Sequence, residues 1–390
     1  MVLSVLEAKS QRPGTDFHAR WIFGRWFWAG EPLYAEVPGV RGPNLYPPFA
    51  AMLFQLHALL PLKVAAGVFY FCNVLLIPIS VRLTKDIFDV LRPGANRWAL
   101  PLAIVLSAQF FLNNLNLNQV NLAVFALCLF GIRAYLRQHD WWAAAALVGA
   151  TAIKVVPLVL VAWLVARGRR RAALAVLPLG IACVALPILQ RGPESGVRDL
   201  TDYYHQVREF GAGRVVQRYT NQNLAAAVYR LMRPPAPTEP TEPTDRDYRV
   251  FTASEQTART VYRAGALLVV AAFLGTLAWL RVSAAPLTVF ELSAAFLAGH
   301  LLSAMTWKAH LVTLLFVFYA FLSLPPRALR PGERVFAGIA AGLMAGSGLI
   351  GRDLFGDTVH HWVGGYSVIV WTMLLLFGGS LWFSWTRAPA

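Results

Sequence analysis

Apolar segments long enough to cross a lipid bilayer recur along the whole of this 390-residue chain. A helix needs about 17–25 mainly apolar residues to span the roughly 30 Å hydrocarbon core of a membrane. We predict spans near residues 64–84, 98–112, 120–137, 171–190, 263–282, 286–302, 309–324, 333–350 and 364–386. The expected fold is therefore an all-α, polytopic transmembrane helical bundle with about 10–11 membrane segments, once a short-armed hairpin is included.

The composition supports a membrane protein. Hydrophobic residues make up 57% of the chain and charged residues 14%, whereas a soluble domain carries about a quarter charged residues. The net charge of +15 comes mostly from arginines that lie between apolar runs. Such bases are typical of topology signals and of contacts with anionic lipid headgroups, so we expect no nucleic-acid partner. The cysteines lie within apolar runs and are interpreted as packing residues, with no metal site predicted.

The most informative segment is "WWAAAALVGATAIKVVPLVLVAWLVARGRRR", which places Lys154 in a long uncharged stretch. Basic residues precede this stretch (Arg133, Arg137) and a cluster of arginines follows it, so both ends are expected on the cytoplasmic side. We therefore interpret residues 141–166 as two short arms that meet near Lys154, with Pro157 breaking the helix. The alternative is one tilted helix from which the lysine snorkels towards the interface.

This orientation divides the chain into four parts. Residues 1–62 form an external N-terminal region, and 63–190 form a transmembrane bundle that contains the broken hairpin 141–166. Residues 191–262 form an external loop with a disordered Pro/Thr/Glu tract at 233–247, and 263–386 form a second bundle. An external N-terminal region requires a preceding export helix, so we expect that a transmembrane helix upstream of residue 1 is missing from this sequence.

Three polar groups of residues share the external side in this topology. Asp16 begins an aromatic-rich segment that suits the membrane interface. Lys154 lies at the hairpin bend, with Gln119 and Asn121 of "NQVN" nearby in the predicted topology. The third group is "SAMTWKAHLVTLL", which carries Trp307, Lys308 and His310 at a span boundary. A lysine in the membrane costs roughly 2.5–3.5 kcal/mol on insertion scales, which favours a functional role for Lys154.

The order of these motifs resembles glycosyltransferase family 87. The resemblance rests on "DF…G.PLY…YPP" near the start, "NQVN", "AIKVVP", "NQNL" in the long loop and "S..TW..H" late in the chain. The late motif departs from the family pattern, because Ala304 and Ala309 stand where the family more often has a proline and a first histidine. Family members are integral-membrane sugar transferases of the GT-C type, and the resemblance covers residues from about 15 to 380.

The resemblance implies an inverting glycosyltransferase that moves a sugar, mannose in most cases, from a polyprenyl-phosphate donor to a lipid or glycan acceptor. It also implies the bacterial inner membrane, with the active site on the periplasmic face. Asp16 is the candidate catalytic base, because a carboxylate can accept the proton of the acceptor hydroxyl. His310, Lys154 and Lys308 are candidates for binding the donor phosphate. Five further residues are candidates for substrate binding: Tyr46, Gln119, Asn121, Trp307 and Asn221. We expect no cofactor other than the lipid-linked donor.

Each candidate also has an ordinary structural interpretation. Asp16 suits a helix N-cap, His310 an interfacial histidine, and Lys308 a helix end. Trp307 suits an interface anchor. The pair His360–His361 is interpreted as part of a solvated loop, because adjacent helical positions do not face the same way.

Two other classes of protein remain possible from the sequence. A multi-span transporter or lipid-linked-sugar flippase also places charged residues at broken helices, but the paired repeats typical of transporters are not visible. A structural subunit would not need Asp16, Lys154 and His310 on one face. The sequence does not identify the sugar, the acceptor or the linkage.

Overall fold

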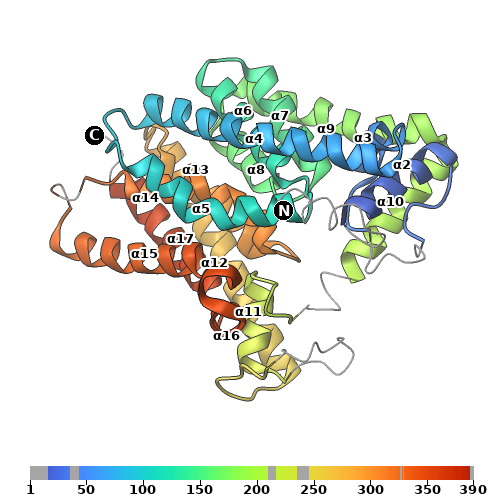
Figure 1. The fold of residues 1–390 in the computed structure, drawn as a ribbon. Coiled ribbons are helices and arrows are strands. Elements are labelled where there is room, and N and C mark those ends of the chain that lie inside the picture. The colour runs from blue at the N-terminus through green and yellow to red at the C-terminus, as the bar shows by residue number, and fades with distance from the viewer. Residues whose placement is uncertain are drawn as a thin grey trace. The chain divides into compact units, whose positions relative to one another are not determined.

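The computed structural model describes residues 16–35, 44–209, 217–234, 246–325, 327 and 329–386. All the regular elements within these ranges are helices (Figure 1), so the predicted all-α fold class is confirmed. The chain packs as two units: unit 1 contains residues 1–83 and 111–214, and unit 2 contains residues 84–110 and 215–390. Most of the predicted disordered tract, residues 235–245, lies outside the described residues.

Unit 1 holds the helices of the N-terminal half, and two long helices are shared with unit 2. Gly192 joins the last two helices of unit 1 with a φ of 81°, a conformation that favours glycine. A Cβ on Gly196 would lie 2.5 Å from the Cα of Ile188, so glycine also permits the close approach of these two helices. The helices are α2 (Asp16–Ala29), α3 (Pro48–Ala58), α6 (Asn121–Leu136), α7 (Asp140–Ile153), α8 (Leu158–Arg167), α9 (Arg170–Arg191) and α10 (Pro193–Arg208), with parts of α4 (Leu62–Leu91) and α5 (Ala99–Asn116).

The predicted hairpin is confirmed in unit 1. Helix α7 ends at Ile153 and α8 begins at Leu158, so Lys154 lies in the break between them. Arg169, two residues after the end of α8, donates from Nε to Oδ1 of Asp140 at the start of α7 over 2.8 Å. The two ends of the segment therefore meet, and each arm is shorter than the roughly 30 Å hydrocarbon core.

Unit 2 is built around two helices that are almost fully buried, α13 and α14. Helix α13 begins with a capping box, in which Thr288 and Glu291 satisfy each other's backbone N–H groups. The elements are α11 (Leu224–Met232), α12 (Glu255–Val282), α13 (Val289–Leu302), the 3-10 helix η2 (Lys308–Thr313), α14 (Leu314–Leu322), α15 (Pro331–Leu349), α16 (Arg352–Gly365) and α17 (Val368–Thr386).

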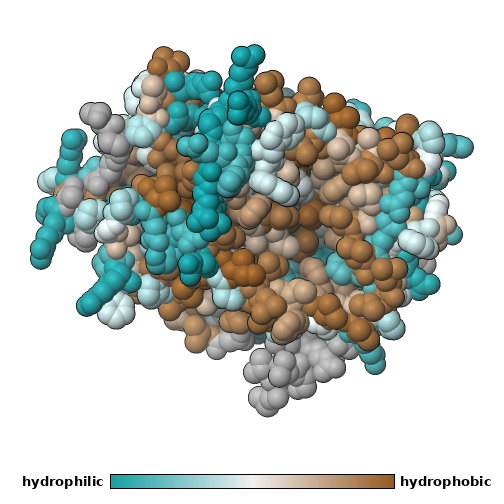
Figure 2. Space-filling model, turned by 90° about the horizontal axis from the view of Figure 1, so that it is seen from above, coloured by the Kyte–Doolittle hydropathy of each residue, from teal (hydrophilic) through white to brown (hydrophobic). Residues whose placement is uncertain are grey.

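The helices of both units identify a multi-pass membrane protein. Five of the described helices are long and apolar enough to cross a bilayer: α4, α5, α9, α12 and α17. A sixth crossing results if α15 and the bent segment that follows it form one broken span. Apolar side chains are exposed over much of the face in Figure 2, as expected for a surface in contact with lipid.

Several predicted boundaries differ from the structure. The spans predicted at 120–137, 286–302 and 309–324 are shorter apolar helices that are largely buried in their own units. Helix α4 continues to Leu91 because Lys85 and Asp89 pair along its surface at 2.5 Å. Helix α12 begins at Glu255, earlier than predicted, because Ser254 accepts a hydrogen bond from the backbone of Thr257 and caps the helix.

Candidate active site

Asp16 lies at the start of α2, within a polar cluster in unit 1. The Nε2 atom of Gln119 donates a hydrogen bond to Oδ2 of Asp16. The hydroxyl of Tyr46 donates to Oε1 of the same glutamine over 3.3 Å. Among the described residues, Oδ1 of Asp16 has no hydrogen-bond partner. The glutamine therefore orients the carboxylate and leaves one oxygen able to accept a proton.

The motif "NNLNLNQVN" forms the turn that presents Gln119. Asn118 adopts a φ of 48°, a left-handed conformation that asparagine tolerates. Its side chain donates to the backbone oxygen of Ala66 on α4 over 3.0 Å and accepts from Asn73 over 3.3 Å. The guanidinium of Arg20, one helical turn after Asp16, donates to the backbone oxygen of Asn118. The turn is thus held by α4 on one side and by α2 on the other.

Lys154 connects to Asp16 through a chain of amide hydrogen bonds. Its ammonium group donates to Oδ1 of Asn121 over 2.6 Å. The amide of Asn121 donates to Oδ1 of Asn114 over 3.3 Å, and Asn114 donates to the backbone oxygen of Gln119 over 3.2 Å. Gln119 then donates to Asp16. Four of the predicted site residues, Asp16, Gln119, Asn121 and Lys154, therefore belong to one network, and Tyr46 joins it through Gln119.

A second cation, Arg20, is fully buried beside this network. Its guanidinium carbon lies 5.0 Å from the ring centre of Phe69 and 5.5 Å from that of Phe17, which are cation–π distances. Its Nε and Nη1 atoms have no hydrogen-bond partner among the described residues. Burial and the nearby Arg20 guanidinium lower the pKa of His57 to about 4, which keeps that imidazole neutral.

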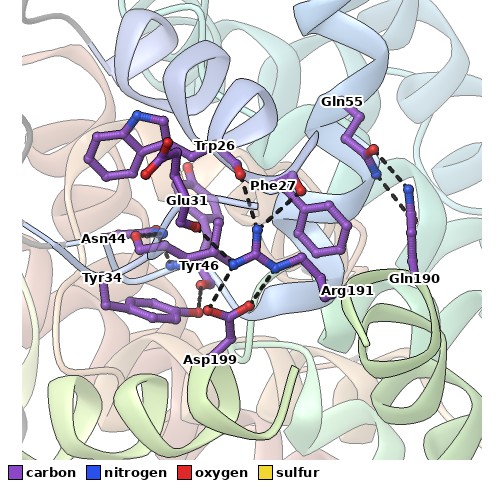
Figure 3. A network of polar contacts seen from close by, with 11 residues as sticks. Trp26, Phe27, Glu31, Tyr34, Asn44, Tyr46, Gln55, Gln190, Arg191 and Asp199 are labelled. Atoms are coloured by element: carbon purple, nitrogen blue, oxygen red, sulfur yellow. Dashed lines mark hydrogen bonds and ion pairs between the residues drawn. The ribbon is translucent and has the colours of Figure 1, made fainter. Parts of the chain in front are cut away.

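Arg191 fixes the opposite end of α2 (Figure 3). It donates from Nε to Oδ2 of Asp199 over 2.9 Å, and this pair is almost completely buried. Its Nη1 atom donates to the backbone oxygens of Trp26 and Phe27, both over 3.1 Å, near the end of α2. Its Nη2 atom donates to the backbone oxygen of Glu31 over 2.8 Å. Arg191 therefore binds α2 to α9 and α10.

Two further contacts in Figure 3 stabilise α3 and the segment that precedes it. Gln55 and Gln190 exchange side-chain hydrogen bonds of 3.3 and 2.9 Å, which join α3 to α9. The hydroxyl of Tyr34 donates to the backbone oxygen of Tyr46 over 2.8 Å. Burial raises the pKa of the Tyr46 phenol, so this group remains a neutral donor. These contacts position Tyr46 for its bond to Gln119.

The remaining predicted site residues lie in unit 2. Lys308 donates to Oε1 of Gln109 over 3.1 Å and to Nδ1 of His360 over 3.2 Å. His310 accepts a hydrogen bond at Nδ1 from the backbone of Trp307 over 3.3 Å, and so caps η2. The convergence of these residues with Asp16 and Lys154 in one pocket stays a prediction.

Asn221 is fully buried, and its side-chain oxygen accepts from the backbone of Thr306 over 2.9 Å. In the structure it therefore holds the loop before η2. The binding of substrate by Asn221 stays a prediction.

The interpretation of His360–His361 as a solvated loop is wrong. Both residues belong to α16, and His361 shares a hydrogen bond of 3.1 Å with the hydroxyl of Tyr219. The ring of Tyr219 contacts both histidine rings edge to face, with ring centres 6.0 and 4.5 Å apart. The expectation from helical spacing failed because one aromatic ring is wide enough to touch two adjacent side chains.

Sequence reasoning missed four residues of these two clusters. Arg20 was available as a base four positions after Asp16, a spacing that places both side chains on one helix face. Asn114 belongs to the quoted Asn-rich motif, but only the fold shows that it bridges Asn121 and Gln119. Gln109 and His360 lie far from Lys308 in the sequence, and no local pattern connects them to it.

The fold and this site define a polytopic helical membrane protein with a carboxylate and cations among buried amides. The model of glycosyltransferase family 87 matches residues 44–305, and the chain belongs to that family. A relative from Mycobacterium tuberculosis is 26% identical over 312 residues, which cover 76% of this chain and 65% of the relative. That protein is described as a polyprenol-phosphate-mannose-dependent alpha-(1-2)-phosphatidylinositol mannoside mannosyltransferase. The chain thus spans just under two thirds of this relative's length, and no solved structure matches it.

Proposed function

We propose that this protein is an inverting glycosyltransferase that moves a sugar, mannose in the first instance, from a polyprenyl-phosphate donor to a lipid or glycan acceptor. The observation that carries this proposal is the chain of amide hydrogen bonds between Asp16 and Lys154. It keeps a carboxylate and a cation within one network, as a reaction with a nucleophilic hydroxyl and an anionic leaving group requires. Family membership and the name of the mycobacterial relative support the donor class.

In the proposed reaction, the acceptor hydroxyl oxygen attacks the anomeric carbon of the sugar. The bond from that carbon to the phosphate oxygen breaks, and its electron pair leaves with the polyprenyl phosphate. The hydroxyl proton passes to Oδ1 of Asp16, the carboxylate oxygen that is not bonded to Gln119. Lys154 faces the negative charge that develops on the leaving phosphate, and its partial burial makes this attraction stronger than it would be in bulk water.

The proposed sidedness follows the distribution of bases along the chain. The arginine cluster Arg169–Arg171 and the end of α6 lie together at the open end of the hairpin, whereas Lys154 lies at its bend. If basic loops remain in the cytoplasm, the bend and the site around Asp16 face the periplasm. A lipid-borne donor can enter such a site from the membrane.

The test is transfer of labelled mannose from polyprenyl-phosphate-mannose by the purified full-length protein in detergent. Asp16→Asn should reduce transfer by roughly 10²–10⁴-fold, the usual contribution of a general base. Asparagine caps helices as well as aspartate does. If Asp16 only caps α2, the Asp16→Asn variant should therefore transfer almost normally. Glu194→Gln, at an exposed carboxylate in unit 1, is the matched control and should transfer normally. Movement of an intact lipid-linked sugar without bond exchange would instead identify a flippase.

A further inference from the structure

Lys308 is a cation whose partners in unit 2 are all neutral. It donates to the amide oxygen of Gln109 over 3.1 Å and to the imidazole of His360 over 3.2 Å. Among the side chains that the structure describes, no carboxylate lies within ion-pair distance of Lys308. A partly buried ammonium group without a counter-ion is costly, and it is normally retained where an anion binds.

The neutral partners are themselves held in place. The amide nitrogen of Gln109 donates to the backbone oxygen of Ser347, so its oxygen points to Lys308. Helix α16, which carries His360, is fixed at its C-terminal end by Gln222, which donates to the backbone oxygen of Gly364 over 2.9 Å. Arg230 also donates to the backbone oxygen of Gly365 over 2.8 Å. The ammonium group is therefore oriented before any ligand arrives, which lowers the entropic cost of binding.

The local groups offer hydrogen-bond donors to a ligand. An ammonium group has three N–H bonds, and the two described partners of Lys308 use two of them. A neutral imidazole that accepts at Nδ1 carries its proton at Nε2, so His360 supplies another donor. A surplus of donors around a cation matches the acceptor oxygens of a phosphate group.

We propose that Lys308 and His360 form an anion site in unit 2 that binds the phosphate group of a lipid substrate. The lipid nature of the ligand rests on the proposed function, whereas the need for an anion follows from the contacts of Lys308. Two lipids supply this chemistry: the phosphomonoester of a polyprenyl-phosphate donor and the phosphodiester of a phospholipid acceptor. Gln109 is a positioning residue in this site, because its side-chain oxygen accepts a hydrogen bond from Lys308 and orients the ammonium group.

The experiment measures lipid binding to the full-length protein in maltoside detergent, which contains no phosphate. The probes are undecaprenyl phosphate and phosphatidylinositol, and their phosphate-free counterparts are undecaprenol and diacylglycerol. Lys308→Met should weaken binding of at least one phosphate lipid by about tenfold or more, since a hydrogen bond to a charged group is lost. A loss for undecaprenyl phosphate assigns the site to the donor, and a loss for phosphatidylinositol assigns it to the acceptor. Binding of the phosphate-free lipids should not change.

Lys85→Met is the matched control in the same unit, because Lys85 is exposed and pairs with Asp89 at 2.5 Å. The melting temperature without lipid separates binding from a structural role: Lys308→Met should be at least as stable as the unmodified protein. If Lys308→Met does not accumulate, Lys308→Arg should keep phosphate binding and His360→Leu should weaken it. Unchanged affinity for both phosphate lipids in Lys308→Met would overturn the proposal. Failure of sugar transfer alone would not, because binding is measured without turnover.

Discussion

Arg191 in unit 1 is a cation with a buried side chain and Lys308 in unit 2 is a partly buried cation, and they have different partners. Arg191 has its counter-ion inside the chain, and the side chains of Arg191 and Asp199 are only 2% and 1% exposed. Its remaining donors bind backbone oxygens at the end of α2. Lys308 has two neutral partners among the described residues. A cation with an internal counter-ion contributes to the fold, whereas a cation without one is available to a ligand.

Lys154 lies between these two cases. Its direct partner is the neutral amide of Asn121, but further hydrogen bonds connect it to the carboxylate of Asp16. This arrangement keeps the opposite charges in one network without a direct ion pair. A negatively charged leaving group can therefore approach Lys154 while Asp16 remains free to accept a proton. We therefore expect Arg191 to have a structural role, and Lys154 and Lys308 to have functional roles, and variants of these residues test this order.

The largest effect on stability is expected for Arg191→Met. Removal of one partner of a buried ion pair leaves an uncompensated charge and costs about 3–5 kcal/mol. The melting temperature in detergent should fall well below that of Arg198→Met, which removes an exposed arginine next to Asp199 in α10.

The double variant Arg191→Met/Asp199→Leu should recover part of this loss, because no buried charge then remains unpaired. If Arg191→Met melts like the unmodified protein, the distinction between paired and unpaired cations does not hold.

The next effect is on catalysis rather than on stability. Lys154→Met should reduce the transfer rate by about 10²–10³-fold, which corresponds to about 2.7–4 kcal/mol of transition-state stabilisation. The melting temperature should stay the same or rise, because an unpaired membrane cation is lost. Transfer assays and thermal melts on the same preparation measure both effects. A fall in melting temperature with normal transfer would place Lys154 in the structural class with Arg191.

The smallest effect concerns His57, which lies beside the buried Arg20. Its pKa in the folded protein is about 4, below the usual value of 6.5. The unfolded chain therefore binds more protons between these values, so stability is highest above pH 6.5 and falls as the pH decreases towards 4. Between pH 7 and pH 5 this histidine should contribute a loss of about 1–2 kcal/mol.

Thermal melts across this pH range should be flatter for His57→Gln than for the unmodified protein. His139→Gln, at an exposed histidine in the same unit, serves as the control and should keep the original slope. Identical slopes for both variants would show that His57 is not held neutral by Arg20 and by burial.

The fold class could be predicted from the sequence because the physical constraint is local. Length and hydropathy of a segment suffice to identify a helix that can cross a bilayer, as for α4, α9 and α17. The boundaries were less predictable. Helices α4 and α12 extend beyond their apolar parts, because side-chain pairs and caps continue a helix into water.

Part of the candidate site was also predictable. The hairpin followed from the distribution of arginines and from Pro157, and it placed Lys154 at the bend. The proximity of "NQVN" to this bend followed from the topology. In contrast, the contacts of Lys308 with Gln109 and His360 depend on three segments that are distant in the sequence.

The sequence by itself determined that this chain is an all-helical membrane protein with a hairpin that bends at Lys154. These properties depend on the hydropathy of each segment and on the basic residues that flank it. Both can be read along the chain without knowledge of the tertiary contacts. Only the tertiary structure decided which cations have an internal counter-ion. Ion pairs and networks of amide hydrogen bonds form between residues that are distant in the sequence. Packing decides which residues pair, and it leaves no local pattern in the sequence. The distinction between Arg191, Lys154 and Lys308 therefore arises from the fold.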